Sequence, residues 1–159
     1  MVEFAVDSML GRLCRWLRML GYDAIFFRGY ESDDELINLV YKSSRILLTR
    51  DFQLYRKALK YGVKAVYIKS GLLEDQLKQL VDDCGINLSI PMDSSRCPIC
   101  NHILRRVSLN EVEDKIPEMV KYSSNDFWVC DGCGKVYWIG KHWRDITYKL
   151  SKIKLKSSL

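Results

Sequence analysis

The sequence lacks any uncharged apolar run that approaches the roughly 20 residues a bilayer-spanning helix needs. Its start, MVEFAVD, places Glu3 and Asp7 where a secretory signal peptide would be basic and then apolar, so we expect a cytoplasmic protein with no membrane partner. Internal repeats and low-complexity segments are also lacking. With 48% hydrophobic and 28% charged residues, the 159-residue chain is not collagen-like, fibrous or disordered, and it is long enough to bury a core.

Net charge is small, +5 at pH 7, but it is unevenly distributed. From residue 141 onward a single acid, Asp145, stands among six basic residues: Lys141, Arg144, Lys149, Lys152, Lys154 and Lys156. A polyanion such as RNA can be attracted to this end. A solvated helix followed by a frayed basic tail explains the same charges equally well.

Four of the six cysteines form two closely spaced pairs, Cys97 and Cys100 in CPIC, and Cys130 and Cys133 in CDGC. Two such knuckles are typical of a structural zinc site in which four thiolates surround one ion at about 2.3 Å. Disulfides are the alternative, but a cytosolic chain lacks the oxidising environment that they need. Because four protein ligands close the site, we expect the zinc to hold a fold and to take no part in chemistry. Cys14 and Cys84 lie on apolar helical faces and are expected to be buried free thiols.

Before Ile90, short apolar runs alternate with helical patterns, which predicts an α/β domain with a mainly parallel sheet covered on both faces. The expected strands are 2–6, 24–27, 45–49 and 63–68, and the expected helices are 10–20, 33–41, 52–61 and 72–84. At Ile90–Pro91 the character changes to cysteine knuckles, a short helix near 109–115 and aromatic strands in DFWVC and KVYWIG. We therefore expect one domain over 1–90 and a small zinc ribbon with a basic C-terminal tail over 91–159.

Acidic residues follow two of the expected strands. Asp7 and Asp51 lie at the carboxyl edge, where open α/β sheets place their sites, and a third group, Asp33, Asp34 and Glu35, begins a helix. Three converging acids without a histidine suit Mg²⁺ or Mn²⁺, which prefer carboxylate oxygens and can activate water against a phosphodiester. Helix capping is the alternative for the Asp33 group and for Asp51, whereas Asp7 has no capping role unless a helix begins directly after it.

Several cationic and aromatic side chains are candidates for RNA contacts. Arg12, Arg15 and Arg18 share the helix beside Asp7, and Arg50 adjoins Asp51, so these arginines can bind phosphates or can simply be solvated. Near the end of the chain, Tyr137, Trp138 and Trp143 can stack on bases or pack inward. We expect structural roles for His102 and His142, although an RNA contact by His142 in GKHW is an alternative.

The sequence resembles the PIN-like ribonuclease family named after the C-terminal region of the Mut-seven protein. The resemblance rests on FAVDSMLGRLCRWLRMLGYDA, SDDEL, ILLTRD, the two cysteine knuckles and CGKVYWIGKHW, and it covers nearly the whole chain in the expected order. It implies a PIN-like three-layer α/β/α fold with a C-terminal zinc ribbon. It also implies that Asp7, Asp33 and Asp51 are the catalytic acids, with Asp34 or Glu35 as alternates for Asp33.

The function that follows from the resemblance is a Mg²⁺- or Mn²⁺-dependent endoribonuclease, in which attack by water leaves a 5′-phosphate and a 3′-hydroxyl. RNA, ribosomal or otherwise structured, is the expected partner, held by the cations named above and by Lys141, His142 and Arg144. Two alternatives stay open: an RNA-binding module of a ribosome or ribonucleoprotein with a vestigial acidic site, and the toxin nuclease of a toxin–antitoxin pair.

Overall fold

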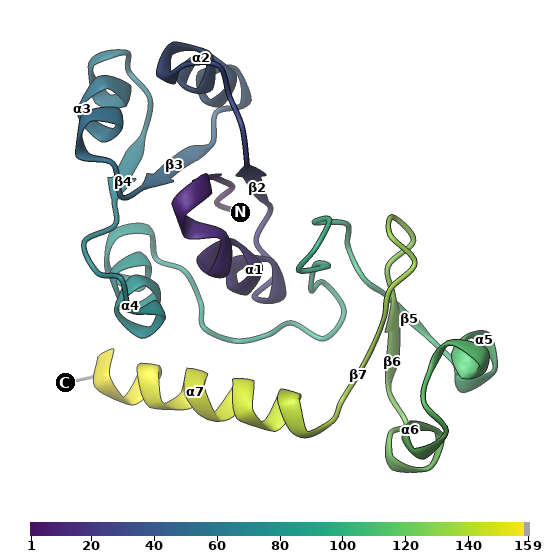
Figure 1. Ribbon diagram of the computed structural model, residues 1–159. Coiled ribbons are helices and arrows are strands. Elements are labelled where there is room, and N and C mark those ends of the chain that lie inside the picture. The colour runs from purple at the N-terminus through teal and green to yellow at the C-terminus, as the bar shows by residue number, and fades with distance from the viewer. Residues whose placement is uncertain (158–159) are drawn as a thin grey trace.

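The structure is a computed structural model. Its central layer is a parallel sheet in the order β2-β1-β3-β4 (Figure 1). The strands are β1 (Phe4–Asp7), β2 (Ala24–Phe27), β3 (Ile46–Thr49) and β4 (Ala65–Tyr67). One face is covered by α1 (Gly11–Met19) and α4 (Leu73–Cys84), the other by α2 (Asp33–Ser43) and α3 (Phe52–Lys60). The predicted α/β class with helices on both faces of a parallel sheet is confirmed. The structure describes residues 1–157, and side chains as far as residue 155, so Lys156 lies outside the side chains described.

Alternation along the strands divides the buried side chains between two cores. Phe4 and Val6 of β1 pack with α1 and α4, whereas Ala5 between them packs with α2 and α3. The same division separates Leu48 from Leu47 in β3. Because successive strand residues point to opposite faces, near-continuous apolar runs are what a sheet buried on both sides requires.

The connections create a switch point between β1 and β3. After β1 the chain passes through η1 (Ser8–Leu10) and α1 to β2 on one side, then crosses to β3 on the other side of β1. The carboxyl ends of β1 and β3 therefore lie side by side with their connections leading away, the position where open α/β sheets bind ligands. Asp7 ends β1 and Thr49 ends β3, so the fold brings the first and third acidic motifs to this edge.

The predicted zinc ribbon is an antiparallel sheet in the order β5-β6-β7, from β5 (Arg105–Val107), β6 (Phe127–Val129) and β7 (Val136–Trp138). The short helix expected near 109–115 is present as α5 (Leu109–Val112) followed by η2 (Glu113–Lys115). The sequence analysis did not anticipate β5 or α6 (Glu118–Ser123). Both are short, and β5 begins with two exposed arginines, so neither shows a clear apolar period.

The basic C-terminal segment is an ordered helix, α7 (Lys141–Ser157), which runs beneath α1 and α4 (Figure 1). Leu150 and Ile153 are buried in the same core as the inner faces of α1 and α4, and Ile146 packs against it. Of the alternative explanation of the C-terminal charges, the helix is present, but its described part is not frayed, because an apolar stripe ties it to residues 1–90. The domain boundary at residue 90 stays a prediction. No helix in the described part of the chain has the length and hydropathy that crossing a membrane requires.

Arg18 fastens the first cysteine knuckle to the sheet. Its side chain is 7% exposed; Nε donates to the Ala24 carbonyl at 2.8 Å, and Nη1 donates to the carbonyls of Pro98 and Ile99, both at 3.0 Å. Nε and Nη1 of Arg18 are therefore used in internal contacts, which favours a structural role over the phosphate contact considered for this residue. Unlike Arg18, its neighbours Arg12 and Arg15 are exposed.

A second bridge lies beside the first. Asn101, at the end of the knuckle, donates from Nδ2 to Asp23 at 2.9 Å, and its Oδ1 accepts from the Ala24 amide at 3.3 Å. Asp23 also accepts from Arg45 at 2.7 Å and pairs with Arg96 at 3.5 Å. Burial opposes the charged form of Asp23, but the hydrogen bonds from Arg45 and Asn101 and the nearby guanidinium charges lower its pKa. The ribbon is thus held to the sheet by a polar network, in which Arg45 Nε has no hydrogen-bond partner among the described residues.

We predict that Arg18→Met lowers the free energy of unfolding by about 2–3 kcal/mol, because three carbonyls lose their charged donor while the aliphatic packing is kept. Urea unfolding followed by circular dichroism measures the change. Arg12→Met, on the same helix but exposed, is the matched control and should change stability by less than about 0.5 kcal/mol. Equal effects of the two substitutions would contradict the role given to Arg18.

Candidate functional site

Asp7 is a buried carboxylate at the switch point between β1 and β3. It is 2% exposed, and both of its oxygens accept hydrogen bonds. Oδ1 accepts from the Ser8 amide at 2.7 Å and from the Tyr30 hydroxyl at 3.0 Å, while Oδ2 accepts from the Thr49 hydroxyl at 2.8 Å. Asp7 does cap η1 through Ser8, because a 3₁₀ turn begins directly after the strand. Capping alone does not require the further contacts with Tyr30 and Thr49.

Asp51 is positioned by the same hydrogen-bond chain. The Thr49 hydroxyl, which donates to Asp7, accepts from the Asp51 amide at 2.9 Å. The Asp51 side chain caps α3, with Oδ1 accepting from the amides of Gln53 at 2.8 Å and Leu54 at 3.1 Å. The capping interpretation of Asp51 is therefore present in the structure, and it uses one carboxylate oxygen.

The pKa of Tyr30 is raised by burial and by the charges of all three predicted catalytic acids. Burial, the charge and hydrogen bond of Asp7, and then the charges of Asp33 and Asp51 raise the pKa of Tyr30 to about 12. Asp33 lies at the start of α2, and its charge acts on the Tyr30 hydroxyl. This is the expected consequence of placing three carboxylates at one edge of a parallel sheet.

The two alternates for Asp33 have other partners. Asp34 forms an ion pair with Lys57 of α3 at 3.0 Å. Glu35 accepts from the Glu31 amide at 2.6 Å, while its own amide donates to the Ser32 hydroxyl at 3.2 Å. Ser32 therefore caps α2, so the capping alternative is present at the start of this helix, to which Glu35 belongs.

The acids do not form as tight a group as the cysteines. Among the described residues, the four cysteines are the one set of three or more potential ligands whose ligand atoms all lie within 4.8 Å of one another. Oxygen donors at wider spacing still fit Mg²⁺, which commonly uses one or two carboxylates and completes its octahedron with water and substrate phosphate. The donor set of Asp7, Asp33 and Asp51 therefore matches the chemistry of a hard divalent cation.

Arginines lie around this edge of the sheet. Arg50, next to Asp51, has a buried Nη1 with no hydrogen-bond partner in the described part of the protein. Arg12 and Arg15 are exposed on α1, the helix that follows Asp7. Arg15 also borders a polar hollow of about 310 Å³ with Arg28, whose guanidinium lies over the Phe26 ring at 5.5 Å. These cations make the surroundings of the acids suitable for an anionic ligand.

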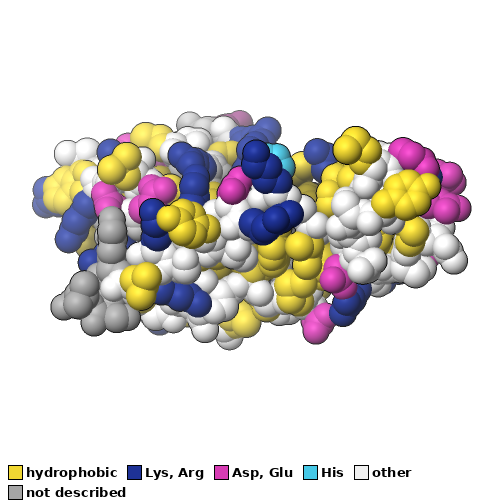
Figure 2. All heavy atoms as spheres, turned by 90° about the horizontal axis from the view of Figure 1, so that it is seen from below, with side chains coloured by type: hydrophobic (Ala, Val, Ile, Leu, Met, Phe, Trp, Pro, Cys, Tyr) yellow, Lys and Arg dark blue, Asp and Glu magenta, His cyan; other side chains and the backbone are white. Residues whose placement is uncertain are grey.

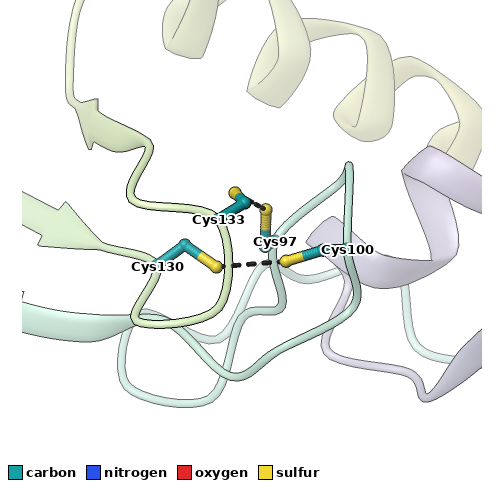
Figure 3. Close-up of side chains that lie close together, drawn as sticks. All are labelled: Cys97, Cys100, Cys130 and Cys133. Atoms are coloured by element: carbon teal, nitrogen blue, oxygen red, sulfur yellow. Dashed lines mark hydrogen bonds between the residues drawn. The ribbon is translucent and has the colours of Figure 1, made fainter.

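The four cysteines meet between the two knuckles (Figure 3). The sulfur of Cys97 lies 3.6 Å from that of Cys133, and the sulfur of Cys100 lies 3.2 Å from that of Cys130. Each knuckle turns back on itself by a hydrogen bond to the carbonyl of its first cysteine, donated by Asn101 at 2.9 Å and by Gly134 at 2.8 Å. Four converging thiols can hold a tetrahedral zinc ion, as the spacing predicted.

The thiols of the cluster differ in acidity: the pKa of Cys97 is lowered, whereas burial raises the pKa of Cys130 to about 12. Burial opposes ionisation of Cys97, but the Tyr137 hydroxyl at 3.1 Å and the amides of Cys100 and Ile99 outweigh it and lower the pKa of this thiol to about 6. The thiolate is the form that binds metal. In contrast, burial raises the pKa of Cys14 to about 11, which leaves that thiol protonated and inert. Cys14 is buried as predicted, and Cys84 is half-buried.

The remaining candidates lie on or near the ribbon. His102 packs directly over Gly132 in the second knuckle, where any Cβ would collide with its ring, so His102 has a structural role. His142 is exposed, as are Lys141 and Arg144 in the first turn of α7. Lys and Arg side chains lie along the α7 face, whereas acidic side chains gather at the outer end of the ribbon (Figure 2). The face of α7 therefore offers positive charge beside the ribbon.

Two polar residues that contact Asp7 were not among the expected site residues. They are Tyr30 and Thr49. Thr49 stands inside the LLTRD motif, and Tyr30 lies two residues before Ser32, so both adjoin segments that were already of interest. The sequence offered one signal for Thr49, because its hydroxyl stands two residues before the predicted catalytic Asp51. The contact of Tyr30 with Asp7 depends on the pairing of β1 with β2 and could not be read from one segment.

We predict that Cys100→Ser reduces the bound zinc from one equivalent to near zero and lowers the melting temperature, because the tetrahedron loses a thiolate. Metal analysis after dialysis and thermal unfolding give the two readings. Cys84→Ser, which changes a cysteine outside the cluster, should retain one equivalent. Zinc retained in both variants, or absent from the wild type, would refute the structural zinc site.

The chain was compared with known protein families, curated proteins and solved structures. The model of one family, described as the Mut7-C RNAse domain, matches residues 2–150. Curated proteins and solved structures gave no significant match. The family match confirms the resemblance inferred from the motifs and agrees with an α/β domain that carries a four-cysteine ribbon. The chain therefore belongs to the Mut7-C RNAse domain family, which indicates a ribonuclease-like function.

Proposed function

We propose that the protein is a metal-dependent endoribonuclease whose active site is the acidic edge of the sheet. The observation that carries the proposal is the buried Asp7 carboxylate at the β1/β3 switch point, hydrogen-bonded to Tyr30 and linked through the Thr49 hydroxyl to the Asp51 amide. A fold alone needs no buried acid with this set of partners. Membership in a ribonuclease domain family supplies the substrate class, RNA.

Asp7, Asp33 and Asp51 would hold Mg²⁺ or Mn²⁺, which when bound supplies a Lewis acid that polarises the phosphodiester and favours ionisation of water. Thr49 fixes Asp7 and the start of α3 together, so two acids keep one relative orientation. Tyr30 stays a neutral hydrogen-bond donor because its pKa is raised to about 12. It is therefore suited to orient Asp7 and unsuited to act as a base.

RNA would reach the acids across basic surfaces. The unpaired Nη1 of Arg50 is a buried donor that a phosphate oxygen can satisfy, within the described part of the protein. Arg12 and Arg15 extend positive charge along α1, and Lys141, His142 and Arg144 extend it to the ribbon side. Phosphate contacts position a nucleic acid without reading its sequence. We therefore expect general RNA affinity from these residues.

Asp7→Asn should reduce cleavage of a labelled structured RNA by at least about 100-fold in Mg²⁺ or Mn²⁺, because loss of a direct carboxylate ligand costs no less than loss of a supporting one. Zinc content, circular dichroism and RNA affinity should stay close to wild type. Asp82→Asn, an exposed acid on α4, is the matched control and should cleave normally. Equal cleavage by the Asp7 variant and the wild type would overturn the assignment, and RNA binding without cleavage by the wild type would favour an RNA-binding module.

Lys141→Gln with Arg144→Gln should weaken RNA binding and reduce the slope of log affinity against log salt by about 1.4, since each phosphate contact to a single strand contributes about 0.7. Fluorescence anisotropy between 50 and 200 mM salt, the range over which such contacts are resolved, measures the slope. The matched control is Lys42→Gln with Lys64→Gln, two exposed lysines at the amino edge of the sheet. If both double variants change the slope equally, α7 has no special part in RNA binding.

A further inference from the structure

A cavity lies where α1, the segment between α4 and β5, the ribbon and α7 meet, away from the acidic edge. Its volume is about 180 Å³. The walls are almost entirely apolar and include four aromatic side chains: Trp128, Tyr137, Trp138 and Trp143. In Figure 2 hydrophobic side chains reach the surface in the middle of the face, between α7 and the ribbon, next to Lys and Arg. A concave aromatic site beside positive charge needs an explanation beyond the ribbon's own core.

The ribbon core uses the other face of its sheet. Phe127 and Val129 of β6 point into that core, so Trp128 between them points to the opposite face, directly across from Tyr137 of β7. Trp143, also in the cavity wall, is half-buried, and so is Trp138, which borders the cavity and also packs against the ribbon core. The sequence left open whether Tyr137, Trp138 and Trp143 stack on bases or pack inward. In the structure all three are half-buried and line a half-open pocket.

One polar atom in this wall has no partner. Trp128 is only 5% exposed, and its buried indole Nε1 makes no hydrogen bond within the described residues. A buried N–H donor is rarely left unsatisfied, because it has lost its water without gaining an acceptor. The ligand that fits must therefore combine an apolar flat body with a hydrogen-bond acceptor.

Size and charge narrow the ligand further. An apolar cavity of about 150 Å³ is enough to hold a benzene-sized ring, so this site suits one planar ring system rather than a whole nucleotide. His142 lies at the wall, and its exposed neighbours Lys141 and Arg144 are placed for phosphates outside the cavity. A nucleobase supplies the flat body and the acceptor, and its strand supplies the phosphates.

We propose that this cavity binds a single unpaired nucleobase of the RNA, stacked against Trp143 and accepting a hydrogen bond from Trp128 Nε1. The inference rests on the proposed function in taking RNA as the ligand, and it names the substrate class as RNA with a single-stranded segment. The base is held on the ribbon side while the acids lie at the sheet edge. The cavity thus selects RNA by an unpaired base at a distance from the cleaved bond.

The test compares two probes, a fluorescently labelled single-stranded RNA octamer and an abasic octamer with the same phosphates. Zinc-loaded protein is used without added Mg²⁺ or Mn²⁺, so that no cleavage is supported. The RNA should bind about tenfold more tightly than the abasic probe and should quench tryptophan fluorescence, since stacking one base on an aromatic side chain changes affinity by about this factor or more. Equal affinities for the two probes, or no binding of either, would overturn the proposal.

Two cavity variants keep the test independent of folding. Trp143→Leu removes the stacking surface, and Leu104→Phe fills the cavity; each should weaken RNA binding about tenfold while leaving the abasic probe unaffected. Tyr148→Leu, an exposed aromatic on the same helix but outside the cavity wall, is the matched control and should bind like the wild type. RNA binding unchanged in both cavity variants contradicts the proposal.

The two proposals fail in different ways. If the wild type binds the RNA octamer in preference to the abasic probe but cleaves no RNA in Mg²⁺ or Mn²⁺, the cavity proposal stands and the nuclease proposal fails. If the wild type cleaves RNA but does not distinguish the probes, the nuclease proposal stands and the cavity proposal fails.

Discussion

The internal hydrogen bonds of Arg18 fix how the two halves of the protein sit together. One guanidinium joins the end of α1, the start of β2 and the first cysteine knuckle, and Asp23 and Asn101 reinforce the junction. A buried charge is tolerated only when its donors are satisfied, and here backbone carbonyls satisfy them. The position of the first cysteine knuckle follows from this junction, whereas α7 is held by its own apolar stripe against α1 and α4.

The acidic edge depends on topology in the same way. Parallel strands place their carboxyl ends together, and the switch between β1 and β3 leaves that edge open for Asp7 and Asp51. Tyr30 donates to Asp7 at this edge, and Asp33 lies at the start of α2. Asp7 and Asp51 also cap a helical turn through one carboxylate oxygen, so capping does not exclude the proposed ligand roles. Capping in fact fixes the orientation of the carboxylates.

Much of this architecture could be predicted from local patterns, because buried parallel strands and amphipathic helices have distinct periods, and paired CxxC knuckles have few alternative explanations. Contacts between distant segments could not be predicted. Arg18 was indistinguishable from its exposed neighbours, since only the arrival of the knuckle makes it internal. The spacing of Ile146, Leu150 and Ile153 did carry a signal for the packing of α7, but the dense lysines around it pointed to a solvated tail.

The most direct test of the metal-dependent nuclease is the chemistry of the product ends. Zinc-loaded wild-type protein is incubated with a 5′- or 3′-labelled RNA with no other divalent cation, with Mg²⁺ or with Mn²⁺, and the new termini are identified by enzymatic treatment and mass spectrometry. The account predicts cleavage only with Mg²⁺ or Mn²⁺, giving 5′-phosphate and 3′-hydroxyl ends. Cleavage that needs no added cation, or products ending in a 2′,3′-cyclic phosphate, would contradict it.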